Sequence, residues 1–180
     1  DSLNTNDKDK YNNKSLVSNF GFRFNENFNL RSSLRFNDSL LNYDEVTAGR
    51  ADSNNKTDDD ELSYNIRLNY KSYNLKNSLI YNYTKINRAT KTYDNSSKNY
   101  YGYRDAINYI GEYSLNLDTK IVFGLDNEFD AAKFQKDWPT DYLVTNESIH
   151  SQYFDIQSRY SERLYHTFGV RRDDHTIAGN

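Results

Sequence analysis

The sequence predicts an all-β protein, an antiparallel up-and-down meander of about eight strands that forms an arc of a larger transmembrane barrel. Three observations predict this fold class. Apolar and polar residues alternate along most of the chain, short and long polar connections take turns between the alternating segments, and aromatic residues are frequent while aliphatic ones are sparse. We expect the whole chain, residues 1–180, to be one partial barrel domain.

The composition argues against an ordinary globular core. Only 36% of the residues are hydrophobic, this share includes 17 tyrosines, and methionine is absent. Low hydrophobicity is typical of disordered chains, but an aromatic content of 16% is not. A membrane barrel fits better, because its outer face is apolar, its lumen is polar, and aromatic girdles mark both bilayer interfaces. The net charge of −3 gives no indication of a nucleic-acid partner, and the absence of cysteine excludes thiol catalysis, disulfides and cysteine-based zinc sites.

Alternation with a period of two is clearest in the segment Phe28–Leu40. Its even positions read Phe, Leu, Ser, Leu, Phe, Asp and Leu, whereas its odd positions read Asn, Arg, Ser, Arg, Asn and Ser. One face therefore suits lipid and the other suits water, whereas a helix would need apolar residues three and four positions apart. The other predicted strands are Lys14–Asn25, Leu62–Tyr70, Leu75–Thr84, Ile107–Leu115, Ile121–Asp126, Ser151–Ser161 and Leu164–Asp173.

The connections alternate in length. Short turns are predicted at regular spacing, with 73 − 26 = 47, 117 − 73 = 44 and 162 − 117 = 45 residues between them. Outer-membrane barrels have this layout, with short periplasmic turns and long extracellular loops, whereas a soluble β-sandwich has shorter strands and need not place its long loops at one end. The short turns are Glu26-Asn27, Tyr73-Asn74, Asn116–Asp118 and Glu162-Arg163, and the long polar stretches are Asp44–Glu61, Arg88–Arg104 and Asp130–His150.

Two barrel architectures fit this pattern. Eight strands could close on themselves, as in the smallest outer-membrane barrels, or they could be an arc of a larger barrel. The chain opens in a charged, asparagine-rich stretch, Asp1–Asn13, and ends in Gly179-Asn180 without a closing strand that finishes in an aromatic residue. These ends favour the arc.

Three segments resemble the TonB-dependent outer-membrane receptors, and among them the vitamin B12 (cobalamin) type. Asn6–Tyr11 contains an Asp-x-Asp pattern similar to a calcium-binding loop of those receptors, and Asn42–Asp44 is similar to the Tyr-Asp pair that completes their calcium site. The separation of the two acidic positions, 44 − 9 = 35, matches the spacing in those receptors. Gly169–His175 is similar to the Arg-x-Asp-Asp strand end of the same class. The resemblance extends over essentially the whole chain.

The resemblance implies a barrel of about 22 strands that encloses an N-terminal plug. It implies a protein of the bacterial outer membrane that takes up vitamin B12 or a similar metal chelate, contacts outer-membrane lipid and performs no enzymatic reaction. TonB would supply energy through a segment ahead of the plug, and neither the plug nor that segment is in this chain. A siderophore or haem receptor is the alternative of the same class. A self-contained eight-stranded barrel with enzymatic or adhesive function is the alternative of a different class.

A calcium site is implied by the same resemblance. Calcium takes roughly six to eight oxygen ligands, and carboxylates from adjacent loops can supply several. Asp52 and the acidic run Asp58–Glu61 offer further oxygens, although solvated loops are often acidic without holding a metal. The predicted ligands are Asp7, Asp9, Tyr43, Asp44, Asp58 and Asp60.

Other side chains carry weaker predictions. Tyr101, Tyr103 and Trp138 lie in predicted long loops and are candidates for ligand contact, with an interface girdle as the alternative. His150, beside Ser148 and Ser151, is the nearest approach to a catalytic arrangement. Charged residues of the polar face are expected to line the lumen in a structural role, namely Arg31, Arg35, Arg67, Asp126, Glu128, Asp155 and Arg159.

Overall fold

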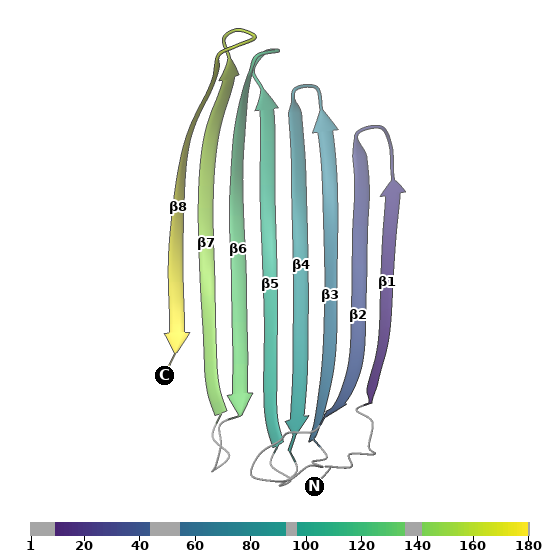
Figure 1. Cartoon of the computed structure of the whole chain (residues 1–180). Helices are drawn as coiled ribbons and strands as arrows, with labels where there is room; N and C mark the ends of the chain where they lie inside the picture. Colours follow the sequence, from purple (N-terminus) through teal and green to yellow (C-terminus); the bar gives the residue numbers. More distant parts are fainter. Residues whose placement is uncertain (1–9, 44–54, 93–96, 136–141, 180) are drawn as a thin grey trace.

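The computed structural model shows one sheet of eight β-strands (Figure 1). The structure describes residues 10–43, 55–92, 97–135 and 142–179, and every structural statement below concerns that part of the chain. No helix within it is long and apolar enough to cross a membrane. The strands are β1 (Tyr11–Arg23), β2 (Phe28–Tyr43), β3 (Asn55–Ser72), β4 (Leu75–Lys91), β5 (Ser97–Ser114), β6 (Thr119–Gln135), β7 (Tyr142–Arg159) and β8 (Tyr165–Gly179).

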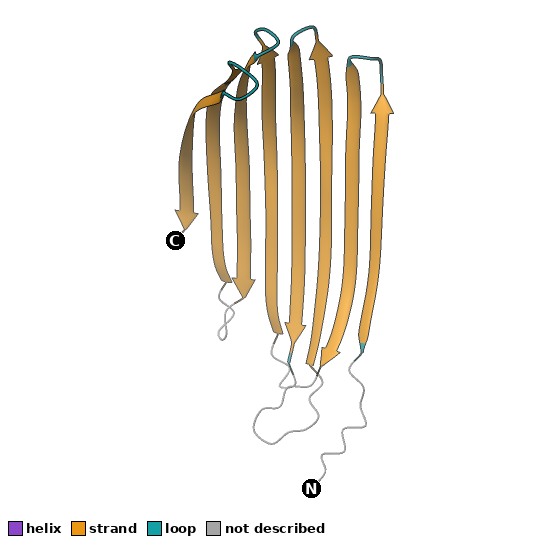
Figure 2. Ribbon diagram, turned by 45° about the horizontal axis from the view of Figure 1, so that its top comes forward, coloured by secondary structure: helices purple, strands orange, loops and turns teal. Residues whose placement is uncertain are grey.

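The sheet is an up-and-down meander, as predicted. Each strand pairs antiparallel with the next one in the chain, so the spatial order is the sequence order from β1 to β8. No ladder joins β1 to β8 among the described residues, and the two strands stand at opposite edges of the sheet (Figures 1 and 2). The chain therefore forms an open sheet rather than a closed eight-stranded barrel.

The strands are longer than the sequence analysis predicted. The predicted strand Ile107–Leu115 is the end of β5, which begins at Ser97, and β7 begins at Tyr142 rather than at Ser151. Much of the three predicted long loops is therefore strand, and that part of the prediction was wrong. The reason is that these strand ends do not alternate. Polar residues fall on both faces of most of them, and β7 begins with three consecutive apolar or aromatic residues, Tyr142–Val144, while the backbones still pair with the neighbouring strands.

The short turns lie where they were predicted, and three of them use the same local chemistry. The side-chain oxygen of Asn25 accepts hydrogen bonds from the backbone N–H groups of Asn27 and Phe28, both at 2.9 Å. Asn116 does the same for the backbone N–H groups of Asp118 and Thr119, both at 2.8 Å, and the Ser161 hydroxyl does it for those of Arg163 and Leu164, at 3.3 and 3.1 Å. Such side chains mimic a backbone turn and favour tight hairpins.

Little of the chain is buried, because the sheet has no second layer. Ile80 and Ala106 are the buried apolar residues among those described, with 8% and 5% of their surface exposed. The ladders between strands, rather than a packed core, connect the elements. A single sheet of this kind is stable only when its apolar face is covered.

The apolar face of the sheet is defined by the even-numbered residues of β2 and their register partners on the other strands. It carries a band of apolar and tyrosine side chains in the half of the sheet nearer the short turns, and many of them are exposed. The band includes Leu16, Phe20, Phe22, Leu30, Leu34, Phe36, Leu62, Ile66, Leu68, Leu79, Tyr81, Ile107, Tyr109, Ile121, Phe123, Leu125, Phe154, Ile156, Phe168 and Val170.

The edge of this band that lies farther from the short turns runs obliquely across the strands. The register carries the position of Phe36 on β2 to Tyr103 on β5 and to Ala178 on β8. The continuous apolar run ends instead at Phe36, Ile107 and Val170, so its edge moves by 107 − 103 = 4 and then by 178 − 170 = 8 residues toward the short turns.

If the band is perpendicular to the barrel axis, this drift gives the angle by which the strands tilt from that axis. Eight residues over the six steps from β2 to β8 is about 1.3 residues per strand. With a rise of roughly 3.3 Å per residue and a strand spacing of about 4.8 Å, the tilt is about 42°. Strands of closed barrels tilt by roughly 35–45° from the barrel axis, so the drift agrees with that of a level band on the wall of a barrel.

Candidate ligand surface on the polar face

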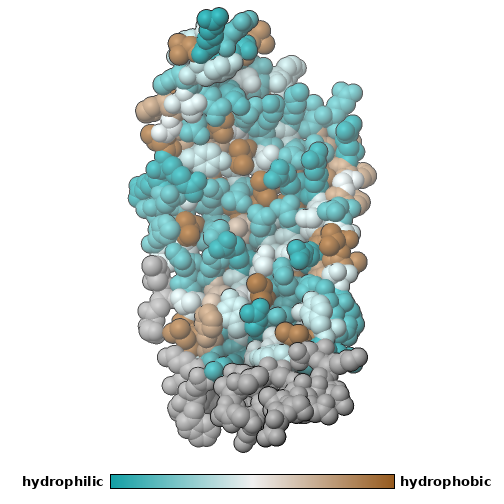
Figure 3. Space-filling model, viewed as in Figure 1, coloured by the Kyte–Doolittle hydropathy of each residue, from teal (hydrophilic) through white to brown (hydrophobic). Residues whose placement is uncertain are grey.

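The polar face is defined by the odd-numbered residues of β2 and their register partners, and it is the face that is hollowed. Hydrophilic side chains dominate the face seen in Figure 3. All seven charged residues predicted for the lumen lie on the polar face in this register. Arg159, for example, donates to Asp118 in the turn before β6, with nitrogen–oxygen distances of 2.6 and 2.8 Å.

Side-chain amides form a chain of hydrogen bonds across the polar face. Asn65 on β3 donates to Asn82 on β4, which donates to Asn108 on β5 at 3.2 Å. Asn108 in turn donates to Asp126 on β6 at 3.1 Å, and Arg171 on β8 lies 3.6 Å from the same carboxylate. Strands β3 to β6 and β8 are thereby connected through side chains as well as through their backbones.

A hollow of about 490 Å³ opens on the polar face near the ends of the strands that carry the long connections. Arg104 lies on its floor and donates two hydrogen bonds of 2.7 Å to Asp130, and its guanidinium is 3.3 Å from Glu128. Glu147 contributes another carboxylate, which is 3.1 Å from the Nδ1 atom of His175. The floor is therefore polar, rich in carboxylates and held in place by ion pairs.

An aromatic pair stands beside this hollow. The rings of Tyr100 and Phe134 are 4.8 Å apart between centroids, and Tyr100 lies over Gly102, where a Cβ atom would meet its ring. Aromatic faces of this kind can stack on a planar or apolar part of a ligand. The sequence analysis counted both among the loop aromatics that could stack on a ligand, but it selected neither as a site residue. The sequence does indicate the face of Tyr100, because extending the alternation of Ile107 and Tyr109 toward the start of the strand puts Tyr100 on the polar face.

The predicted ligand-contact residues Tyr101 and Tyr103 belong to the other face by register, although Tyr103 also contributes to the lining of the hollow. Tyr101 and Tyr103 are on the apolar face, where the Nζ atom of Lys85 is 5.5 Å from the Tyr101 ring and Phe129 is 5.6 Å from the Tyr103 ring. This position agrees with the alternative that they belong to an interface girdle. Trp138 lies outside the described residues.

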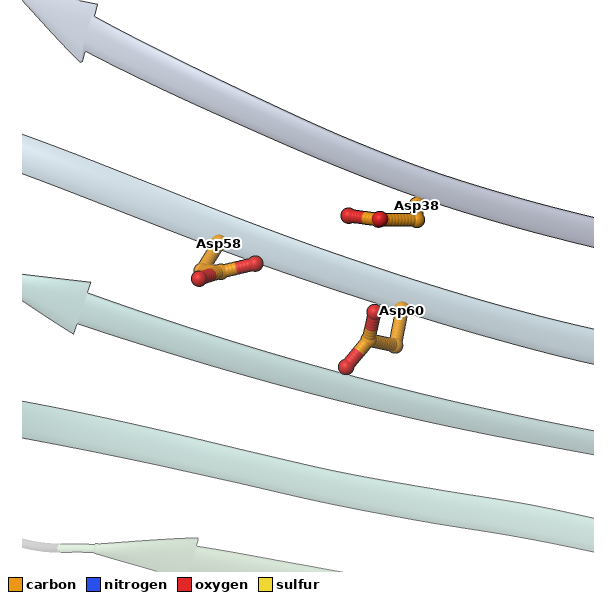
Figure 4. Close-up of side chains that lie close together, drawn as sticks. All are labelled: Asp38, Asp58 and Asp60. Carbon is orange, nitrogen blue, oxygen red and sulfur yellow. The ribbon is translucent and has the colours of Figure 1, made fainter. Parts of the chain in front are cut away.

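The predicted calcium ligands are only partly brought together. Asp58 and Asp60 of β3 lie close to Asp38 of β2, with oxygen atoms within 4.8 Å of one another (Figure 4). This acidic cluster is on the apolar face beyond the band, whereas Tyr43 is on the polar face. Two lysines partly neutralise it, since the Nζ atom of Lys14 is 3.6 Å from Asp38 and that of Lys56 is 3.8 Å from Asp58.

The remaining predicted ligands, Asp7, Asp9 and Asp44, lie outside the described residues. Asp38 was missed by the sequence analysis, although it carried a signal. It is the one charged residue on the even positions of Phe28–Leu40, which are apolar apart from Ser32, and the register sets it opposite Asp60. An oxygen-only set of three carboxylates suits a hard divalent cation such as calcium.

The arrangement around His150 does not assemble a nucleophile and a base. His150 and Ser151 are neighbours in one strand and point to opposite faces. Asp174 is the register partner of His150 on β8, but its carboxylate accepts hydrogen bonds from Arg172 at 3.4 and 3.1 Å.

Comparisons with known proteins add a fold-level likeness. No protein-family model matches the chain, and no curated protein matches it in sequence. Among solved structures, it is similar to the structure of the RagAB peptide importer in the "closed-closed" state, with a TM-score of 0.63 at 12% sequence identity. The likeness covers 93% of this chain and 28% of that chain, so the chain spans little more than a quarter of the matched length. At this identity the likeness concerns the fold alone.

Proposed function

We propose that this chain is part of the wall of an outer-membrane barrel that imports a nutrient across the bacterial outer membrane. The level apolar band carries the proposal. On β5 the band extends from Ile107 to the residue after the strand, Leu115, and these nine residues (115 − 107 + 1 = 9) rise about 22 Å along the barrel axis at the derived tilt. Outer-membrane barrels have an apolar belt about 25 Å tall.

The rest of each strand would stand outside the bilayer. β5 continues for ten residues beyond Ile107, from Ser97 to Ala106, since 106 − 97 + 1 = 10. These extensions and the long connections would form the mouth of the barrel, and the hollow with Tyr100 and Arg104 faces into that mouth. This position supports a role in first contact with a ligand.

Import is favoured over adhesion or catalysis because the hydrogen-bonded polar face suits a lumen wall, and because the structurally similar protein is an importer. We expect the uptake to depend on TonB and to involve no covalent chemistry. The resemblance of the loop sequences favours vitamin B12 or another metal chelate as the ligand. A peptide is the second candidate, supported by the similarity to the RagAB peptide importer.

Calcium is part of the same proposal. An ion held by Asp38, Asp58 and Asp60 would tie β2 to β3 at the base of the connection between them, with Asp7, Asp9 or Asp44 as further ligands. The support is the proximity of the three carboxylates and the preference of calcium for oxygen donors.

Competition binding on the full-length protein in detergent tests the proposal. Cyanocobalamin, a ferric chelate, haem and a mixture of short peptides would each be titrated with and without calcium. Binding of one class, weakened by Tyr100→Ala and left unchanged by Tyr101→Ala, is the expected result. Failure of all four classes to bind to a correctly inserted barrel would remove the import proposal.

A further inference from the structure

We propose that Arg31, Arg35 and Arg67 form a binding site for a ligand's anionic oxygen group, a carboxylate or a phosphate, on the polar face between β2 and β3. The inference rests on the proposed function, because it places the site on the inner wall of a barrel. It adds the chemical class of ligand that this wall takes.

The register places the three arginines on the same face of two neighbouring strands. Arg31 and Arg67 are direct cross-strand partners, and Arg35 is four residues from Arg31 on the same face of β2. Like charges directly opposite each other destabilise a sheet unless something compensates them. The site therefore has a repulsion that an anion between the arginines would relieve.

No residue that the structure describes supplies that compensation. All three arginines are exposed, and no ion pair or hydrogen bond joins them to a described residue. Four other arginines on the same face each lie within 3.6 Å of a carboxylate, whereas Arg23, at the short-turn end of β1, also has no ion pair with a described residue. Those four are Arg88 with Asp59, Arg104 with Asp130, Arg159 with Asp118 and Arg171 with Asp126.

A hollow of about 310 Å³ adjoins Arg35 and supplies neutral donors. Arg35 lines it together with the hydroxyl groups of Ser33, Ser63 and Thr84 and the amide of Asn65. Guanidinium groups match the geometry of carboxylate and phosphate oxygens with paired hydrogen bonds, and hydroxyl and amide donors complete the shell of such an anion. A cation would find no partner in this hollow, because no carboxylate is among the residues that line it.

The depth of the site determines when a ligand meets it. Arg31 and Arg67 are next to Leu30 and Leu68 in sequence, which point into the apolar band on the other face. The arginines are therefore within the bilayer span, beyond the carboxylate-rich hollow at the mouth. An anionic ligand would reach them after it has left the mouth.

Calorimetry on the full-length protein in detergent tests the site, with citrate as the carboxylate probe and tripolyphosphate as the phosphate probe. We expect at least one of them to bind, and Arg35→Gln or Arg67→Gln to weaken that binding roughly ten-fold, since charged hydrogen bonds are lost. Arg163→Gln, in an exposed turn, is the matched control and should bind like the parent protein. The probe that binds identifies the preferred anion.

A second measurement covers variants that fold poorly. The bound anion should raise the thermal unfolding temperature of the unaltered protein above its value in chloride of equal ionic strength. Absence of binding by both probes, or equal binding by the Arg35→Gln and Arg67→Gln variants, would overturn the site. If the apolar band then still contacts lipid, only this inference fails; if it does not, the barrel itself is wrong.

Discussion

Tyr153 on β7 lies over Gly124, its direct register partner on β6, so that a Cβ atom at Gly124 would meet the tyrosine ring. The guanidinium of Arg171 is 5.9 Å from the centroid of the same ring. The glycine thus lets an aromatic residue lie flat against the polar face and links three neighbouring strands.

Gly124→Val should displace the Tyr153 ring and destabilise the protein by about 1–3 kcal/mol, the usual cost of overpacking. Thermal unfolding of the full-length protein in detergent measures the effect. Gly21→Ala is the matched control, since a Cβ there comes no closer than 4.0 Å to a neighbouring atom, and it should leave stability almost unchanged. Equal effects of the two substitutions would show that the ring contact has no energetic role.

The hairpin between β3 and β4 contains a strained residue. Tyr73 has a φ of 42° in its turn, in the left-handed region that asparagine and glycine adopt more readily. Tyr73→Asn should therefore stabilise the protein by about 1 kcal/mol. Tyr73→Phe keeps the same backbone demand and should not. If asparagine destabilises the protein instead, the contribution of the tyrosine side chain exceeds the strain.

The aromatic pair beside the mouth should contribute to ligand affinity. Loss of one ring by Tyr100→Ala or Phe134→Ala should weaken binding about three- to ten-fold, since an aromatic contact contributes roughly 0.5–1.5 kcal/mol. Tyr101→Ala removes the adjacent ring on the opposite face and should leave the affinity unchanged. Titration of the ligand found in the competition experiment gives the answer, and a larger effect at Tyr101 would reverse the assignment of faces.

The acidic cluster should respond to calcium. Asp60→Asn and Asp38→Asn remove one carboxylate each and should weaken calcium binding measured by calorimetry, because carboxylate ligands neutralise the ion. Asp59→Asn is the matched control, since Asp59 points to the polar face and accepts a hydrogen bond from Arg88 at 2.6 Å. Equal calcium affinity in all three variants would exclude the cluster as a ligand set.

The half of the sheet that carries the apolar band was predictable from the sequence, whereas the strand ends near the long connections were not. Between Phe28 and Phe36 the burial requirement alternates, so the pattern reveals both the strand and its faces. Between Ser97 and Arg104 polar and tyrosine residues fall on both faces, so the sequence carries no alternation and resembles a loop. Only pairing with β4 and β6 defines the strand there.

The candidate site residues were also predictable only in part, because their grouping depends on the pairing between strands. Asp58 and Asp60 were singled out from the sequence as calcium ligands, but the register alone shows that Asp38 joins them and that Tyr43 points away. Likewise, Arg31 and Arg67 lie directly opposite each other on neighbouring strands, and no local sequence pattern reveals this pairing.

The central claim is that the apolar band is level in a bilayer although it drifts along the strands. Single cysteines at Phe36, Ile107 and Val170 of the full-length protein, each carrying a spin label, would report their depth in lipid vesicles. The account predicts lipid exposure and equal depth for all three labels, despite register offsets of 4 and 8 residues. Labels in water, or depths that differ by the rise of those offsets, would contradict it.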